Sequence, residues 1–193
     1  MPTNKGVTSF LSAAQHGDID ALSLYLEEGQ GDVNAINSSC ETALIQAAKN
    51  NQIAAVEFLL DQEGINVAIA GANKFAAIHY AVQRGYFEIT EKLITQNPNI
   101  VNSKSDRNWE PLHFAVFEGY SKIAKFLIIK GADVSAVAIN KGGGELQMSD
   151  LTTDAEMIDL INSQGASSPL SLSRVFSAER PVEMGRLVGE GRK

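Results

Sequence analysis

Residues 110–134 read EPLHFAVFEGYSKIAKFLIIKGADV, and residues 76–100, which lie 34 positions earlier, read AAIHYAVQRGYFEITEKLITQNPNI. Two further steps of 34 residues reach TALIQAAKNNQIAAVEFLLDQEGIN from Thr42 and TSFLSAAQHGDIDALSLYLEEGQGD from Thr8. A fixed period of this size is typical of stacked supersecondary units, which bury their apolar faces against one another. The repetition therefore predicts an elongated array with one continuous core.

A fifth unit, GELQMSDLTTDAEMIDLINSQGA from Gly144, keeps the apolar positions but has Thr153 where the other units have glycine or asparagine. Terminal units face solvent on one side, so an atypical last unit is expected to cap the array. The predicted organisation is a lead-in at 1–7, repeat units at 8–41, 42–75, 76–109 and 110–143, a degraded capping unit at 144–163, and a C-terminal extension at 164–193.

Each unit contains two short segments with apolar residues at helical spacing. In the fourth unit, Leu112, Ala115 and Val116 share one face of the first segment, as expected of an amphipathic helix. Between the two segments the chain must reverse, and there the units carry the residues that best tolerate a left-handed backbone. These residues are Gly17, Asn51, Gly85 and Gly119.

The starts of the first helices are marked by capping residues. Thr8 and Thr42 stand where a side-chain oxygen would cap the helix. Pro111 stands at the first helical position, where its missing N–H costs nothing. Ala76 cannot cap, so we expect the third unit to begin less firmly.

The stretch EPLHFAVFEGYSKIAKFLIIKGADVSA resembles the ankyrin repeat, whose pattern is T-P-L-H, two alanines, a glycine, a second apolar helix and G-A-D-V-N. AAIH, RGYFEITEKLI, TALIQAAKNN and EEGQGDVNA are weaker versions, so the resemblance covers about residues 8–163. Ala76, Ile45 and Thr153 depart from the pattern. The resemblance implies an all-α solenoid of stacked helix-turn-helix pairs with β-hairpin-like loops, and a non-catalytic role in binding another protein.

The charge is uneven, because residues 1–165 hold 11 Lys and Arg against 20 Asp and Glu, whereas residues 166–193 hold 5 against 3. An acidic body repels phosphate backbones, so we expect no nucleic-acid partner. No apolar run approaches the roughly 20 residues that cross a bilayer, and MPTNKGVTSF lacks the apolar stretch of a secretory signal. We therefore expect no membrane insertion and a cytoplasmic location, or the host cytosol for a secreted bacterial effector. The lone Cys40 fits a reducing compartment.

The candidates for chemistry are few. His79 and His113 lie 34 residues apart and belong to the repeat motif, where this histidine links a helix to the neighbouring loop. Cys40 with His16 does not supply the roughly four ligands of a zinc site. The glycines of KGGGE from Lys141 lack the spacing of a phosphate-binding P-loop. We predict no enzyme activity, no metal and no cofactor.

The resemblance also implies a concave groove with projecting loop tips, on which aromatic residues of units three and four would form a stripe flanked by arginines. Aromatic residues and arginine dominate the binding energy of many protein interfaces. Tyr80 and Phe114 could equally pack between helices. The predicted partner-binding residues are Phe75, Tyr80, Arg84, Arg107, Trp109, Phe114, Phe117 and Glu118.

Trp109 is the predicted anchor for the partner. It follows the polar tip Asp106-Arg107-Asn108 and precedes a helix start, where an indole has no obvious core to enter. On this interpretation, Trp109→Ala weakens binding by ~2 kcal/mol or more and leaves the stability nearly unchanged.

The predicted function is protein–protein interaction as an adaptor, inhibitor or secreted bacterial effector, by a monomer that self-associates at most weakly through its C-terminal end. Two alternatives stay open: a targeting or regulatory fragment of a larger enzyme, and a self-associating structural protein. The extension at 164–193 is either a short helix from Ser171 or Ser173 that caps the array, or a linear motif.

Overall fold

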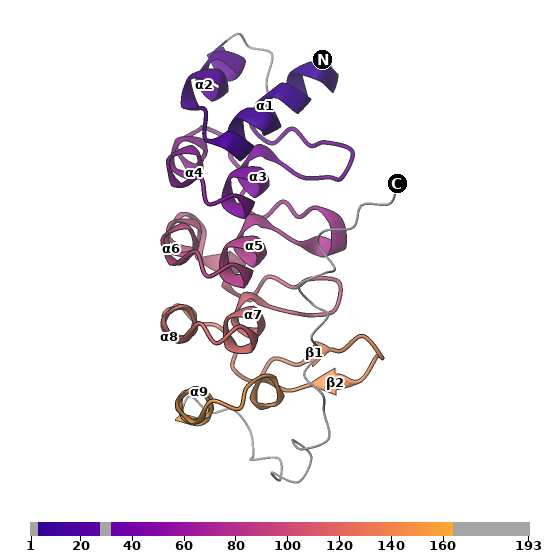
Figure 1. Ribbon diagram of the computed structural model, residues 1–193, viewed down its shortest axis with the longest axis vertical. Coiled ribbons are helices and arrows are strands. Elements are labelled where there is room, and N and C mark those ends of the chain that lie inside the picture. The colour runs from indigo at the N-terminus through magenta and orange to yellow at the C-terminus, as the bar shows by residue number, and fades with distance from the viewer. Residues whose placement is uncertain (1–3, 28–31, 164–193) are drawn as a thin grey trace.

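Apolar residues at helical spacing form two parallel columns of helices in the computed structural model, which describes residues 4–27 and 32–163 (Figure 1). The first column holds α1 (Asn4–His16), α3 (Ala43–Lys49), α5 (Ala77–Gln83) and α7 (Pro111–Phe117). The second, outer column holds α2 (Ile19–Glu27), α4 (Ile53–Leu60), α6 (Phe87–Gln96), α8 (Ser121–Ile129) and α9 (Ala155–Ser163). The predicted all-α solenoid is confirmed.

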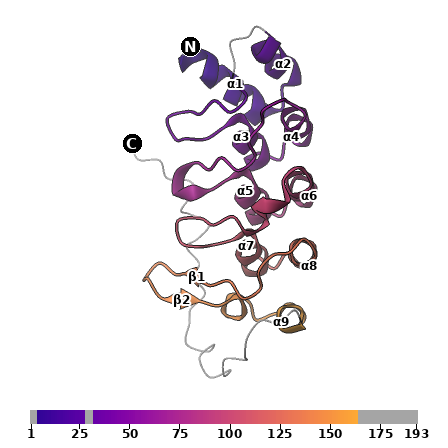
Figure 2. The same cartoon turned by 180° about the vertical axis from the view of Figure 1, so that it is seen from behind.

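Hairpin loops project from the first column, on the side away from the outer column (Figure 2). We call the segments 33–42, 67–76, 101–110 and 136–146 fingers one to four. Fingers one and two each hold a single antiparallel bridge, and finger four holds the antiparallel strands β1 (Ala138–Ile139) and β2 (Glu145–Leu146). Three short 3-10 helices complete the described structure: η1 (Ala72–Lys74), η2 (Pro98–Asn102) and η3 (Met148–Leu151).

The predicted helix starts are confirmed for two units and wrong for one. Thr42 Oγ1 accepts a hydrogen bond from the Ile45 N–H at 3.2 Å, and Pro111 is the first residue of α7. Thr8, in contrast, lies inside α1, because this helix begins at Asn4, within the predicted lead-in. α1 is also longer than the other first helices, with 13 residues against 7 in each of α3, α5 and α7.

The turns between paired helices are left-handed, as predicted. Asn51 has φ +57° and Gly85 has φ +75°. At Gly85 a second constraint applies, because an added Cβ would lie 2.9 Å from the ring of Tyr120 in the next unit. The turn residue therefore also sets how closely neighbouring units approach.

Neighbouring units are joined by asparagine side chains that repeat at twice the period. Asn102 donates from Nδ2 to the Gly131 carbonyl at 3.2 Å and accepts at Oδ1 from the Asp133 N–H at 3.0 Å. Asn34, two periods earlier, bonds in the same way to the Gly64 carbonyl and the Asn66 N–H. These bonds fix the bases of fingers one and three to the loop that follows the second helix of the next unit.

The degraded last unit covers the end of the core with less helix than the others. Finger four leads into η3, which lies where a first helix would stand, and then into α9. Met148 of η3 and Met157 and Ile161 of α9 are buried, so both segments still contribute to the core. The predictions made for 164–193 lie outside the described residues.

No helix in 4–27 or 32–163 is long and apolar enough to cross a membrane.

Candidate functional site

The fingers and the first-column helices from which they project form one side of the molecule, which we call the finger-side surface (Figure 2). The eight predicted binding residues all come from finger two, finger three, α5 and α7, or directly follow these helices. Their exposure differs. Arg84 and Glu118 are exposed, Phe75, Arg107 and Phe117 are partly exposed, and Tyr80, Trp109 and Phe114 are buried.

The five aromatic rings form one continuous series of contacts, which we call the aromatic row. The ring of Phe75 lies 5.3 Å from that of Tyr80 and 5.3 Å from that of Phe114, between centroids. Trp109 continues the row, 5.0 Å from Phe114 and 5.7 Å from Phe117. Such tilted and edge-on contacts stabilise aromatic pairs beyond the area they bury. The row therefore connects the core of unit three to that of unit four.

Trp109 is part of this core, so the prediction that it lies free at a loop tip is wrong. Its side chain is 3% exposed, and its Nε1–H donates to the Ile139 carbonyl at 3.2 Å. Ile139 belongs to β1 in finger four, which covers the indole. The sequence pattern gave no sign of this cover, because the contact joins residues 30 positions apart and no local motif relates them.

The fingers are also hydrogen-bonded to one another through their backbones. The Asp106 N–H donates to the Asn73 carbonyl at 3.0 Å, which joins finger three to finger two. The Ile139 N–H donates to the Arg107 carbonyl at 2.9 Å, which joins finger four to finger three. Neighbouring finger tips therefore hold each other in place.

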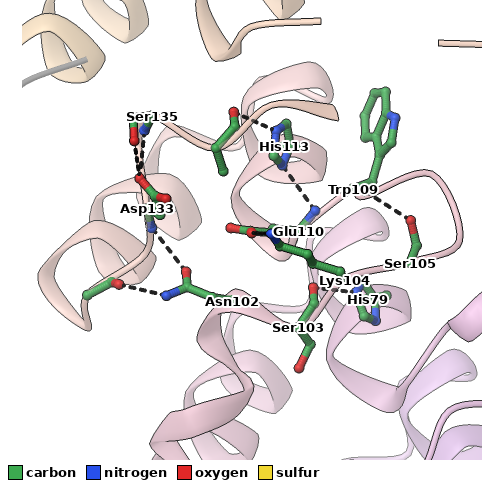
Figure 3. A network of polar contacts seen from close by, with 12 residues as sticks. His79, Asn102, Ser103, Lys104, Ser105, Trp109, Glu110, His113, Asp133 and Ser135 are labelled. Atoms are coloured by element: carbon green, nitrogen blue, oxygen red, sulfur yellow. Dashed lines mark hydrogen bonds and ion pairs between the residues drawn. The ribbon is translucent and has the colours of Figure 1, made fainter. Parts of the chain in front are cut away.

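The motif histidines are structural, as the sequence indicates (Figure 3). His113 Nδ1 accepts from the Glu110 N–H at 3.0 Å, and its Nε2–H donates to the Ala136 carbonyl at 3.1 Å. His79 makes the same pair of bonds to the Ala76 N–H and the Ser103 carbonyl. Burial lowers the pKa of both rings to about 4, so both are neutral near pH 7, with both nitrogens engaged. The bond to Ala76 also holds a helix start that lacks a side-chain cap.

Glu110 is a buried carboxylate with incomplete partners, at the position that Thr42 occupies two periods earlier. It is 1% exposed, and its Oε1 lies 3.5 Å from Lys104 Nζ. Its Oε2 has no hydrogen-bond partner among the described residues. Burial raises the pKa of the Glu110 carboxyl. The charged form of Glu110 therefore costs stability at neutral pH.

We expect Glu110→Thr to raise the free energy of unfolding by about 1 kcal/mol, measured by urea denaturation at pH 7. The substitution removes a poorly compensated charge and supplies a hydroxyl that can cap α7 as Thr42 caps α3. The lost ion pair is a small cost, because Lys104 is 59% exposed. The matched control is Thr42→Ala, which should lower the stability by a similar amount. A Glu110→Thr protein less stable than the wild type would show that the carboxylate is favourable in place.

A polar network lies beside the aromatic row, at the side of unit two. Glu41 accepts from Gln46 Nε2 at 2.7 Å and from Lys49 Nζ at 3.2 Å. The Tyr80 hydroxyl lies 3.5 Å from the same carboxylate. Burial, together with the nearby Glu41 charge, raises the pKa of Tyr80 to about 12. The phenol therefore stays protonated near neutral pH.

Within the described ranges, no group of three or more His, Cys, Asp or Glu side chains is arranged to hold a metal ion. A family model described as "Ankyrin repeats (3 copies)" matches residues 2–70 and 66–138. These residues include the helices from α1 to α8 and the whole aromatic row. No curated protein matches the chain.

Proposed function

Because the chain belongs to the ankyrin-repeat family, we propose that it binds a partner protein. The proposed binding site is the finger-side surface of units three and four. Ankyrin repeats are generally protein–protein interaction modules, and domains built from them are typically non-catalytic. The proposal assigns the chain a role as adaptor, inhibitor or secreted effector, acting in a cytosol on a protein rather than a nucleic acid.

The observation that supports the proposal is the difference in exposure between the rings of the aromatic row. Phe75 and Phe117 are partly exposed, whereas the three rings between and beside them are buried. Each accessible ring packs against a buried one, Phe75 against Phe114 and Phe117 against Trp109. An apolar side chain that is already fixed loses little conformational entropy on binding. The row therefore supports binding directly at its accessible rings and indirectly through Tyr80, Trp109 and Phe114.

The charges around these rings indicate the chemistry of the partner. Arg84 is exposed just after α5, and Arg107 is partly exposed in finger three. Glu118 is exposed one residue after Phe117. Apolar groups with arginines at their rim suit a partner segment that presents an apolar side chain next to carboxylates.

We expect the variant Arg84→Ala/Arg107→Ala/Phe117→Ala to recover at least about tenfold less partner than the wild type in an affinity pull-down from lysate of the producing or host cells. The variant removes two arginines and one ring from the finger-side surface. Circular dichroism must first show that it is folded. Mass spectrometry then compares the proteins recovered.

The matched control is Lys125→Ala/Phe126→Ala/Lys130→Ala, which removes two cations and one partly exposed ring from the outer column. It should recover the same protein as the wild type. If the finger-side variant recovers as much partner as this control, the proposed surface is wrong.

A further inference from the structure

The outward faces of the outer helices differ sharply in charge from unit to unit. In each of the first four units, residues at spacing i, i+3, i+4, i+7 and i+8 share this face, of which the first four are described in unit one. The set in unit four is basic and apolar, and the sets in the first three units carry acidic residues. In chain order they are Asp20, Ser23, Leu24 and Glu27; Ala54, Glu57, Phe58, Asp61 and Gln62; Glu88, Glu91, Lys92, Thr95 and Gln96; and Lys122, Lys125, Phe126, Ile129 and Lys130.

The α8 stripe, which we define as Lys122, Lys125, Phe126, Ile129 and Lys130, is open to solvent. Ile129 is 80% exposed, and the three lysines are exposed around it. Lys122 Nζ lies 3.7 Å from the centroid of the Phe87 ring. Across 4–27 and 32–163, none of the three lysines forms an ion pair with a carboxylate. The stripe thus combines uncompensated positive charge with an exposed apolar side chain.

The α2 stripe, which we define as Asp20, Leu24 and Glu27, is its counterpart. Leu24 is 57% exposed, and both carboxylates are exposed beside it. Glu27 accepts from Ser23 Oγ at 2.7 Å and has no lysine or arginine partner among the described residues. In the described part of the chain, Leu24 and Ile129 are the exposed large apolar residues that lie on helices.

We propose that the α8 stripe docks the α2 stripe of a second molecule of this chain. The two stripes cannot meet within one molecule, because α4 and α6 separate α2 from α8 in the outer column (Figure 1). Between molecules, the lysines would face the carboxylates, and Ile129 would cover Leu24. The pairing uses the outer column, so it leaves the finger-side surface free and does not depend on the proposed function.

The neighbours of α8 favour a partner no wider than one helix. Glu88 and Glu91 are exposed on α6, and Glu156 and Asp159 are exposed on α9. A bilayer or a nucleic-acid duplex laid across the column would meet these carboxylates as well as the lysines, and like charges repel. A single acidic helix laid along α8 avoids them. The α2 stripe has that width and that charge.

The expected association is weak and sensitive to salt. Exposed ion pairs stabilise association only slightly, so we expect a dissociation constant of about 0.1–1 mM at low ionic strength. At about 1 M salt the Debye length falls to about 3 Å, and the association should be lost.

Sedimentation equilibrium of the full chain at concentrations up to about 1 mM tests the proposal. The wild type should gain mass with concentration in low salt. Lys122→Glu/Lys125→Glu/Lys130→Glu and, separately, Asp20→Lys/Glu27→Lys should each weaken the association at least about tenfold. An equimolar mixture of the two variants should associate again, because the unchanged α2 stripe of the lysine variant can pair with the unchanged α8 stripe of the other variant. The two reversed stripes are also complementary in charge.

The matched control for the α8 variant is Lys74→Glu/Arg84→Glu/Lys141→Glu, which changes the net charge by the same amount on exposed residues of the finger side. It should associate like the wild type. A wild type that stays monomeric in low salt would overturn the proposal. So would a mixture of the two variants that fails to associate. Binding of the wild type to anionic vesicles without any self-association would assign the α8 stripe to a lipid surface instead.

Discussion

Trp109→Ala is expected to lower the free energy of unfolding by about 3–5 kcal/mol, the usual cost of removing a large buried aromatic side chain. The indole is 3% exposed and contacts three other rings. Its removal would also leave the Ile139 carbonyl without the Nε1–H that it accepts. We therefore expect the substitution to loosen finger four and the junction between units three and four.

Urea denaturation followed by far-ultraviolet circular dichroism measures this effect. Intrinsic fluorescence cannot be used for the variant, because Trp109 is the single tryptophan of the chain. Phe117→Ala is the matched control, since this ring is in the same row but partly exposed, and it should cost clearly less. A Trp109→Ala protein as stable as the wild type would restore the original interpretation of Trp109 as a free anchor.

The stability is expected to fall as the pH is lowered from about 6.5 towards 4, because His79 and His113 must stay neutral in the folded state. Burial lowers the pKa of each ring to about 4, so the unfolded chain binds protons first. The stability that the two neutral histidines contribute is complete above the unfolded pKa of about 6.5 and is lost progressively below it. Near pH 4 the loss is on the order of 2–3 kcal/mol for each histidine.

The measurement is the free energy of unfolding at several pH values between 7.5 and 4.5, for the wild type and for His113→Gln. The variant should show a shallower decline, although it is less stable at pH 7 because a helix start and a loop carbonyl lose their partner. Glu110 acts in the opposite direction because its pKa is raised, so the difference between the two proteins isolates the histidine. His16→Gln is the control for the substitution itself, since this ring is exposed and does not occupy the repeat-motif position. A wild-type stability that is flat over this range would contradict the account.

Much of the fold could be predicted from the sequence, because the 34-residue period repeats features that act locally. Asn51 and Gly85 mark the left-handed turns, and Thr42 and Pro111 mark helix starts. The predicted start of α1 was wrong, because Thr8 has the chemistry of a cap but the helix begins earlier, at Asn4. Local patterns show where a helix can begin, and only the surrounding structure decides whether it begins earlier.

The candidate site was less predictable, because burial depends on contacts that lie far apart in the chain. Trp109 sits in a polar stretch, yet β1, about 30 residues later, covers it. The charge stripes on α2 and α8 were present in the sequence as a difference between aligned positions. Only the structure shows that the charged and apolar residues of each stripe are exposed on the same helix. For Glu110, the sequence shows a glutamate at a threonine position but not that the carboxylate is buried.

The most direct test of the proposed function is site-specific photocrosslinking in lysate of the producing or host cells. One preparation carries a photoreactive amino acid at position 84 on the finger side, and the other carries it at position 125 on α8. Both positions are exposed, so neither replacement should disturb the fold. The account predicts one prominent protein crosslinked from position 84 and not from position 125. Crosslinking of the same protein from position 125 alone would contradict binding through the finger-side surface.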